Sequence, residues 1–360
     1  MDMVEHLKVG YNFTYDLLDF LIEQNLCCQK SKIYEVYGSR KESSFLTARP
    51  AFRIPDVSRH EFRKHIEKLQ QNNIGFNYTL NTSCLGNKKD IFKIKKTIQD
   101  YIRFLMDCGV KTITITLPIM AEFIRELSDE VNIEISTIAN IDTVTQVKLW
   151  KEYYNVNKLC GNLSRNRDIT FLENLSNYCN SNEIVLSLLA NEFCINGTCY
   201  DGYCSYTDCI YRTHCYQLHS LGYDVNDVYF DDYPMQRCIN SRNNALGWLK
   251  SNFIRPEDMG LYNQIGINHF KLTGRTGSTE YMKRIISAYM SQHYEGNLLE
   301  LWKHLETISC NNDLFVPPFV ILNEKLDGFL EFWFSNKTHR CSNEICGETC
   351  TYCDNFYKKL

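Results

Sequence analysis

Long apolar runs are missing from this sequence of 360 residues. No stretch approaches the roughly 18 consecutive uncharged apolar residues that a membrane-spanning helix needs. The N-terminal segment carries Asp2, Glu5 and Lys8, so it lacks the uninterrupted apolar region of a secretory signal peptide. We therefore expect no membrane association and a cytoplasmic location.

An excess of positive charge is missing as well. Lys and Arg total 39 while Asp and Glu total 43, which gives a formal net charge of −4. This balance excludes a generally basic surface as the means of holding nucleic acid and leaves open only a local basic patch.

The common catalytic signatures are also absent. The sequence contains no HExxH, no GxSxG, no Walker A motif and no GxGxxG after an expected strand. The histidines are scattered, and none falls in a recognisable Ser-His-Asp pattern. These absences disfavour the zinc peptidases, α/β-hydrolases, P-loop enzymes and dinucleotide-binding enzymes that those motifs define.

What the sequence does contain is a regular alternation of two patterns. Short apolar, β-branched segments typical of strands cover residues 8–13, 33–37, 75–80, 112–117, 134–139, 158–162, 183–189 and 269–273. Helical periodicity covers residues 15–25, 59–72, 91–108, 120–128, 143–154, 169–179 and 279–293. This order predicts an α/β protein built from parallel βα units. Eight strands favour a TIM-like (β/α)8 barrel over the alternative, an open doubly wound sheet.

Cysteine is frequent, with 17 residues, and in a reducing compartment clustered cysteines indicate metal or redox sites before disulfides. An irregular segment, residues 191–266, interrupts the alternation after the seventh strand. It contains Cys194, Cys199, Cys204, Cys209, Cys215 and Cys238. Thiolates that converge in space can hold zinc or an iron–sulfur cluster, and the lack of a tight CxxC pair weakens the zinc interpretation. His214 and His219 are either ligands or surface residues.

A second cysteine cluster lies in a C-terminal extension, residues 306–360, which we separate from a barrel domain of residues 1–305. Its members are Cys341, Cys346, Cys350 and Cys353. The last three have the CxxxCxxC spacing of radical-SAM enzymes, in which a barrel follows the motif. Too little chain follows Cys353 for that arrangement, so we expect a closed iron–sulfur or zinc site instead.

Polar residues occupy the carboxyl ends of several expected strands, where a (β/α)8 barrel builds its active site. Asn77, Asn81 and Asn191 are candidates to orient a substrate, and Lys271 with Arg275 suits a carboxylate or phosphate. The alternative is that these residues cap helices and close βα turns.

The chain resembles the U32 "peptidase" family in several ordered strings. They are RPAFRIPD at residues 49–56, FNYTLN at 76–81, CLGN at 84–87, NEFC at 191–194, FIRPED at 253–258 and IGINHFKLTGR at 265–275. The resemblance extends from about residue 8 to residue 300. The cysteine-rich tail is similar to one found in a subset of the family.

The resemblance implies a TIM-like barrel with a [4Fe–4S] cluster held by four cysteines. Well-understood members are oxygen-independent hydroxylases of tRNA, ribosomal RNA or ubiquinone precursors, and prephenate is the oxygen donor for several of them. Transferred residue by residue, the ligand set is Cys194, Cys209, Cys215 and Cys238, with Cys199 as a fifth candidate. This chain departs from the family by inserting Cys199 and Cys204, and by having Cys215 where relatives often have His.

Three functional hypotheses follow. The first is an iron–sulfur-dependent, oxygen-independent hydroxylase or related modifying enzyme, with a prephenate-like donor and a small molecule, peptide or RNA base as substrate. The second is a U32-type peptidase. The third is a non-catalytic iron–sulfur subunit that works with a paralogous partner.

Overall fold

Eight parallel strands close into a barrel in the computed structural model, which describes residues 4–49, 51, 54–86, 88–192, 244–275, 277–302 and 319–360. The strands are β1 Glu5–Gly10, β2 Ser31–Gly38, β3 Gly75–Leu80, β4 Thr112–Ile115, β5 Asn132–Ile135, β6 Lys158–Cys160, β7 Val185–Leu189 and β8 His269–Leu272. Each strand pairs with the next in the sequence, and β8 closes the barrel by pairing with β1, with Lys271 opposite Lys8. The prediction of a TIM-like (β/α)8 fold is confirmed, and the open doubly wound sheet is excluded.

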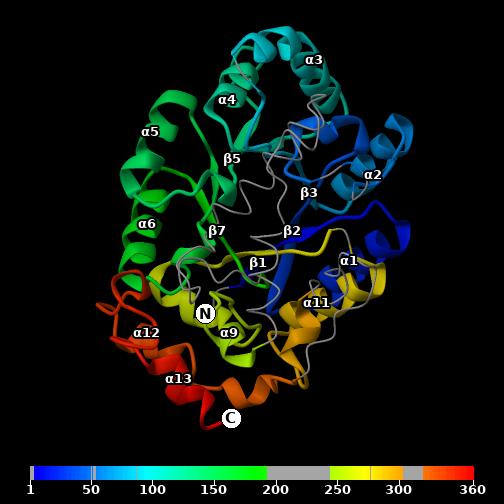
Figure 1. Cartoon of the computed structure of the whole chain (residues 1–360). Helices are drawn as coiled ribbons and strands as arrows, with labels where there is room; N and C mark the ends of the chain where they lie inside the picture. Colours follow the sequence, from blue (N-terminus) through cyan, green and yellow to red (C-terminus); the bar gives the residue numbers. More distant parts are fainter. Residues whose placement is uncertain are drawn as a thin grey trace, which may run out of the picture.

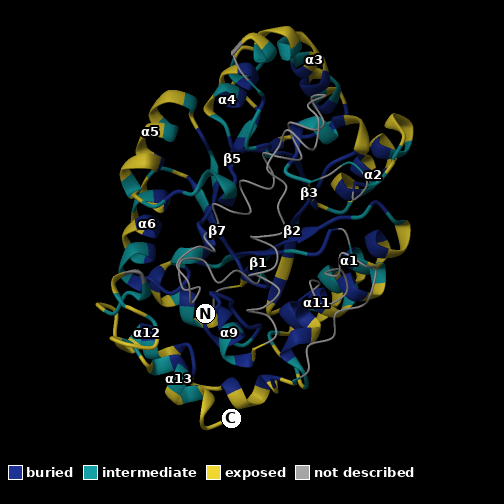
Figure 2. Ribbon diagram, in the orientation of Figure 1, coloured by how far each residue is buried: buried dark blue, intermediate teal, exposed yellow. Residues whose placement is uncertain are grey.

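Helices surround the strands in a ring (Figure 1). Those of the βα units are α1 Tyr15–Cys27, α2 Arg59–Gln71, α3 Lys88–Asp107, α4 Pro118–Arg125, α5 Val144–Tyr154, α6 Ile169–Ser181 and α11 Thr279–Ser291. They turn buried residues toward the barrel and exposed residues toward solvent (Figure 2). This division follows from the helical periodicity of the apolar residues.

The starts of these helices are set by polar side chains that accept bonds from free backbone N–H groups. Ser58 caps α2 by accepting from the N–H of Glu61 at 3.1 Å, and Ser278 caps α11 in the same way. Thr143 and Gln146 form a reciprocal capping box at α5. These caps lie where the sequence indicates helix starts.

Strand ends differ from the prediction where a polar residue begins a turn. The fifth expected strand, 134–139, ends at Ile135 because the side chain of Ser136 accepts from the N–H of Ile138 and starts a short 3-10 helix. The first expected strand, 8–13, lies earlier in the chain, at Glu5–Gly10. The third expected strand has the observed bounds.

The rest of the described chain forms short elements that the periodicity did not predict. The α-helices are α9 Ala245–Leu249, α10 Met259–Tyr262, α12 Glu331–Ser335 and α13 Tyr352–Tyr357. The 3-10 helices are η1 Lys41–Leu46, η3 Thr137–Ala139, η4 Leu163–Arg165, η6 Asn263–Ile265, η7 Leu298–Leu301, η9 Asn323–Leu326 and η10 Cys341–Asn343. Among the described residues, no helix has the length and apolar character needed to cross a membrane.

Residues 319–360, the C-terminal extension as far as it is described, pack beside α6 and α9 (Figure 1). The hydroxyl of Thr170 in α6 donates to the carbonyl of Lys337 at 2.5 Å. Phe329, Trp333 and Cys353 belong to the same hydrophobic core cluster as the barrel. The division between residues 305 and 306 falls outside the described residues and stays a prediction.

Candidate functional site

The interior of the barrel is charged. Lys8 on β1 contacts Glu134 on β5 directly, although these two strands lie on opposite sides of the eight-stranded ring. Such a contact has to pass through the interior, so both side chains point inward. Barrel interiors are more often filled by branched aliphatic residues.

Glu134 is the centre of this network and is completely buried. Its carboxylate contacts Lys8, accepts a bond from the Asn77 amide at 2.8 Å, and lies 3.5 Å from the Lys271 ammonium. Burial alone would raise the pKa of this carboxyl, but Lys8 and Lys271 outweigh burial and lower it to about 2. Glu134 is therefore an anion held in place by two lysines.

Glu35 on β2 is the second buried carboxylate of the interior. It contacts Lys158 on β6 and lies 3.6 Å from the Lys8 ammonium. Asn77 donates to both carboxylates, to Glu35 at 3.2 Å, and its own carbonyl oxygen accepts from Thr114 at 2.6 Å. Asn77 thus has partners for both ends of its side chain, and its role toward a substrate stays a prediction.

The structure brings Lys271 and Arg275 together at the carboxyl end of the barrel. The Lys271 ammonium lies 4.4 Å from the centre of the Tyr37 ring, and the Arg275 guanidinium lies 5.7 Å from it. The Tyr37 hydroxyl donates to the carbonyl of Leu272 at 3.0 Å, which fixes the ring. Two cations therefore lie close to one aromatic ring at the mouth.

Arg275 is only 7% exposed, and its Nη1 has no hydrogen-bond partner among the described residues. Burial and, to a smaller extent, the positive charge of Arg49 together lower the pKa of its guanidinium to about 10. A buried cation with a free donor is destabilised unless an anion approaches it. The close approach of the Arg275 backbone depends on Gly10, since a Cβ on that glycine would lie 2.7 Å from the Arg275 nitrogen.

The other two predicted asparagines bond to backbone around the mouth. Asn191 accepts from the Thr273 N–H at 2.6 Å and donates to the carbonyl of Leu301 at 3.1 Å, so it joins the end of β7 to the end of β8. Asn81 accepts from the Ala48 N–H at 3.2 Å. Both residues hold loops in place, and contact with a substrate stays a prediction for each.

The six cysteines of the insertion lie outside the described residues, with His214 and His219. They are Cys194, Cys199, Cys204, Cys209, Cys215 and Cys238. The described chain leaves the barrel after Asn191 and resumes at Asn244, and the N–H of Ile254 bonds to the carbonyl of Ala190 at 3.0 Å. The insertion therefore begins at the carboxyl end of β7, on the same end of the barrel as Arg275.

The tail cysteines (Cys341, Cys346, Cys350 and Cys353) are described and carry free thiols. Within the described ranges, no group of three His, Cys, Asp or Glu side chains is arranged around a single metal position. The tail cysteines are nevertheless close enough to act on one another, because charge on the other three would raise the pKa of Cys353. A metal at these residues stays a prediction.

Sequence reasoning missed the charged residues of the interior. Lys8, Glu35, Glu134 and Lys158 each lie within a strand of the barrel. Parallel strands covered on both faces are usually continuous apolar runs. A charged residue inside such a run could have indicated a buried ion pair, because Lys and Glu are almost never fully buried unless they are paired.

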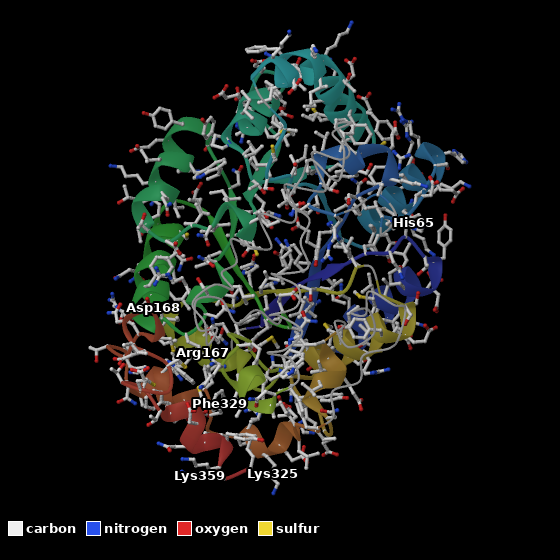
Figure 3. The ribbon with its side chains drawn as sticks, viewed as in Figure 1. His65, Arg167, Asp168, Lys325, Phe329 and Lys359 are labelled. Carbon is white, nitrogen blue, oxygen red and sulfur yellow. The ribbon has the colours of Figure 1, made fainter. Side chains whose placement is uncertain are left out.

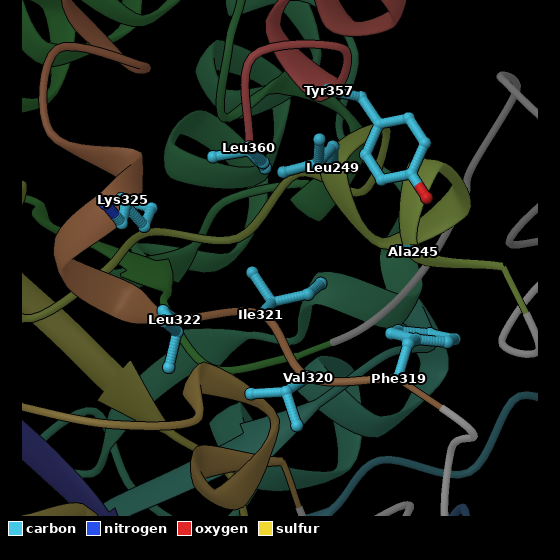
Figure 4. A pocket seen from close by; sticks show the side chains of 9 residues that line it. All are labelled: Ala245, Leu249, Phe319, Val320, Ile321, Leu322, Lys325, Tyr357 and Leu360. Atoms are coloured by element: carbon cyan, nitrogen blue, oxygen red, sulfur yellow. The ribbon is translucent and has the colours of Figure 1, made fainter.

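A cavity of about 360 Å³ lies away from the mouth, between α9 and the chain that begins at Phe319 (Figure 4). Its lining is mostly apolar and includes Leu249, Ile321 and Leu360, with Lys325 as the cation. None of the predicted site residues lines it.

Comparison with known proteins gives one family. The model of peptidase family U32 matches residues 30–297. A curated protein of Methanocaldococcus jannaschii, named as an uncharacterized protease, is 29% identical over 338 residues, which cover 92% of this chain and 88% of that protein. A solved structure of a U32 peptidase shares 10% identity and a TM-score of 0.47, over 76% of this chain and 94% of that one.

Proposed function

The chain belongs to peptidase family U32, and from this membership we propose that it is an enzyme that binds a carboxylate of its substrate or co-substrate at Arg275 and Lys271. The observation that carries this proposal is the free Nη1 of the buried Arg275 side chain. A carboxylate is the planar anion that a guanidinium binds best, through two parallel hydrogen bonds.

The surroundings of the two cations suit such a ligand. Lys271 is fixed by Glu134 at 3.5 Å, so its ammonium adds positive charge without having to be ordered on binding. Tyr37 lies close to both Lys271 and Arg275 and gives the site one apolar wall. Because the site is buried, the interaction with an anion is stronger than it would be in water.

We further propose that Cys194, Cys209, Cys215 and Cys238 hold a [4Fe–4S] cluster, with Cys199 as the reserve ligand. Cysteine thiolates are the donors that such clusters use, and the insertion that carries them begins at the same end of the barrel as Arg275. The cluster would supply redox or Lewis-acid chemistry to an oxygen donor.

The reaction class that fits both parts is oxygen-independent hydroxylation or a related modification. The carboxylate bound by Arg275 and Lys271 would belong to a prephenate-like donor, and the substrate would be a small molecule, a peptide or an RNA base. In this assignment Arg275 orients the donor, and Asn191 holds the β7 and β8 ends that shape the site.

Binding of prephenate to anaerobically purified protein tests the carboxylate site. We expect Arg275→Gln to weaken binding by about 10- to 100-fold, the value of one or two charge-assisted hydrogen bonds. Arg103→Gln, an exposed arginine on α3, should bind like the wild type. Equal affinity in all three proteins would remove Arg275 from the site.

Metal and sulfide analysis with EPR tests the cluster. We expect about four irons per chain in the anaerobic protein and loss of iron in Cys194→Ser. Protein that stays free of iron after reconstitution would overturn this part of the proposal. Co-purification with a paralogue, and no turnover alone, would favour the partner-subunit hypothesis.

Peptidase activity is the second candidate, and its support is the name of the family and of the Methanocaldococcus relative. The described chain has a cysteine and a histidine in contact, Cys350 Sγ and His339 Nε2, at 3.5 Å in the C-terminal extension. A peptidase that used this pair would hydrolyse peptides without iron and would lose activity in His339→Ala. Hydrolysis that requires iron would exclude it.

A further inference from the structure

Arg167, just before α6, is buried where the barrel meets the C-terminal extension, among three aromatic rings. Its guanidinium lies 4.6 Å from the Trp333 ring centre, 5.1 Å from Phe329 and 5.3 Å from Phe253. The residue is 2% exposed, and Figure 3 shows it beside Phe329 where the extension meets the barrel. This cation is therefore separated from bulk water.

The guanidinium has one hydrogen bond and two free nitrogens. Nη1 donates to the carbonyl of Leu249 at 2.9 Å, whereas Nε and Nη2 have no partner among the described residues. The neighbouring carboxylate, Asp168, is committed elsewhere: it caps α6 and lies 3.4 Å from Arg165. A buried charge without a counterion is costly, so a further negative group is expected near Arg167.

Two of the tail cysteines share neighbours with this cation. Trp333 faces Arg167 with its ring and donates from Nε1 to the sulfur of Cys341 at 3.2 Å. The sulfur of Cys353 lies 3.9 Å from the same Leu249 carbonyl that Arg167 binds. Arg167 and these two thiols therefore lie in one small region of the fold.

A second buried cation lies beside the segment that carries the thiols. Lys250 is 3% exposed, and its ammonium is 3.9 Å from where a Cβ on Gly347, next to Cys346, would lie. Its ammonium pairs with Asp354 at 3.1 Å. His339 contacts Cys350 at 3.5 Å. Polar and positively charged groups thus lie beside the tail cysteines.

We propose that the tail cysteines bind one zinc ion as four thiolates, and that Arg167 compensates the negative charge of this centre from inside the fold. Binding of Zn²⁺ by four thiols releases four protons and leaves a group of charge −2. That group would supply the anion that the free nitrogens of Arg167 lack. This inference is independent of the proposed function, which concerns the barrel mouth.

Zinc fits these surroundings better than an iron–sulfur cluster. Trp333, which bonds to Cys341, and Phe329, which packs against Trp333, are both buried, as is Cys353. A single ion needs only that four sulfurs approach it to about 2.3 Å, whereas a cubane needs room for its iron and sulfide atoms. The sulfurs described here are not yet arranged around one point, so zinc must draw them together.

Zinc content and cobalt spectroscopy test the proposal on the full chain. We expect one zinc per protein after purification, and an S₄ first shell from X-ray absorption at the zinc edge. Co²⁺ added to zinc-depleted protein should give the visible absorption of a tetrahedral tetrathiolate. Cys350→Ser should lose the zinc, and the matched control Cys27→Ser, an exposed cysteine in α1, should keep it.

Arg167 has its own test, which a purely structural role would not satisfy. Groups next to metal ligands typically change metal affinity by about 10- to 100-fold. We expect Arg167→Gln to weaken Zn²⁺ binding by this factor in a competition with a chelating dye, and Arg167→Lys to recover part of the loss. A variant that unfolds would be recognised by circular dichroism.

Alkylation of wild-type protein gives a result even if the variants do not fold. Zn²⁺ should protect the tail cysteines from iodoacetamide and leave Cys27 reactive. The proposal is overturned if Zn²⁺ protects none of them, or if iron and sulfide occupy these cysteines. Loss of iron in Cys194→Ser with zinc retained would separate this site from the proposed cluster of the insertion.

Discussion

The barrel interior and the C-terminal extension both bury positive charge, but they balance it differently. Lys8, Lys158 and Lys271 each contact a buried carboxylate of the same chain, Glu35 or Glu134. Arg167, at the border with the extension, has aromatic rings around it and two nitrogens without a partner among the described residues. The interior lysines are thus paired with carboxylates, whereas Arg167 has no carboxylate partner in the described part of the chain. Arg275 at the mouth resembles Arg167 in this respect.

This contrast distinguishes charged side chains that stabilise the fold through ion pairs from charged side chains that are available to bind an anion. Lys8 and Lys158 contact their carboxylates directly and would gain little from an added anion, whereas Lys271 lies 3.5 Å from Glu134 at the mouth and can contribute to a ligand held by Arg275. A buried arginine with free N–H groups would gain most of the free energy of a charge-assisted hydrogen bond when an anion binds to it. The two arginines are therefore the positions where ligand binding is expected to change stability.

The largest expected effect comes from breaking the interior network. We expect Glu134→Ala to lower the free energy of unfolding by about 3–5 kcal/mol, because it leaves the buried Lys8 with only the longer contact to Glu35 and removes the carboxylate that pairs with Lys271. Glu173→Ala, which removes an exposed ion pair with Lys337, should cost less than about 1 kcal/mol. Urea denaturation of the two variants checks this difference. Similar losses in both would show that the interior charges are not coupled.

Acid should remove part of the same stabilisation. The folded pKa of Glu134 is about 2, below its ordinary value of 4.5, so the folded protein binds fewer protons than the unfolded chain between these values. The contribution of this carboxylate is complete above pH 4.5 and is lost as the pH falls toward 2. Denaturation at several pH values should show this slope in the wild type and a smaller one in Glu134→Gln.

A smaller effect is expected from crowding the mouth. Gly10→Ala places a Cβ against the Arg275 backbone, and overpacking of this kind typically costs about 1–3 kcal/mol. The matched control is Gly260→Ala in α10, where an added Cβ meets no atom within 4 Å. Thermal unfolding compares them, and anion binding should weaken in Gly10→Ala alone. A Gly10→Ala protein as stable as the control would contradict the close approach.

The smallest expected effect on the free energy of unfolding comes from replacing Arg167 in zinc-depleted protein. Arg167→Met removes the cation–π contacts and the bond to Leu249, but it also removes two unsatisfied donors. We expect a loss of about 1 kcal/mol in zinc-depleted protein, well below that of Glu134→Ala. Urea denaturation with and without Zn²⁺ checks it, since the gap between wild type and variant should widen when zinc is present.

Much of the fold could be predicted because the barrel repeats one simple pattern. Short β-branched runs and amphipathic helices alternate, and the polar residues that cap helices, such as Ser58 and Thr143, mark their starts. The ends of the strands were harder to predict, because a residue such as Ser136 can be either the last residue of a strand or the N-cap of a short helix. The short helices around Cys353 have too few residues for periodicity to show.

The candidate site could be predicted only in part. Lys271 stands out within the last strand and Arg275 just after it, and the structure places both close to the Tyr37 ring. Glu134 and Arg167 could not be paired from the sequence, since their partners lie far along the chain and meet them only through the closed barrel or the packed extension. Such pairings depend on tertiary geometry, which local patterns do not encode.

The hydrogen bond between Ile254 and Ala190 also bears on how proteins of this kind can diversify. It brings the residue before the insertion next to Ile254, in the later part of the insertion, so the two meet at the barrel rim however many residues lie between them. Lengthening such a loop twofold changes its closure free energy by only about 0.6 kcal/mol. The insertion can thus be exchanged, shortened or extended during evolution or protein engineering while the strand register stays unchanged.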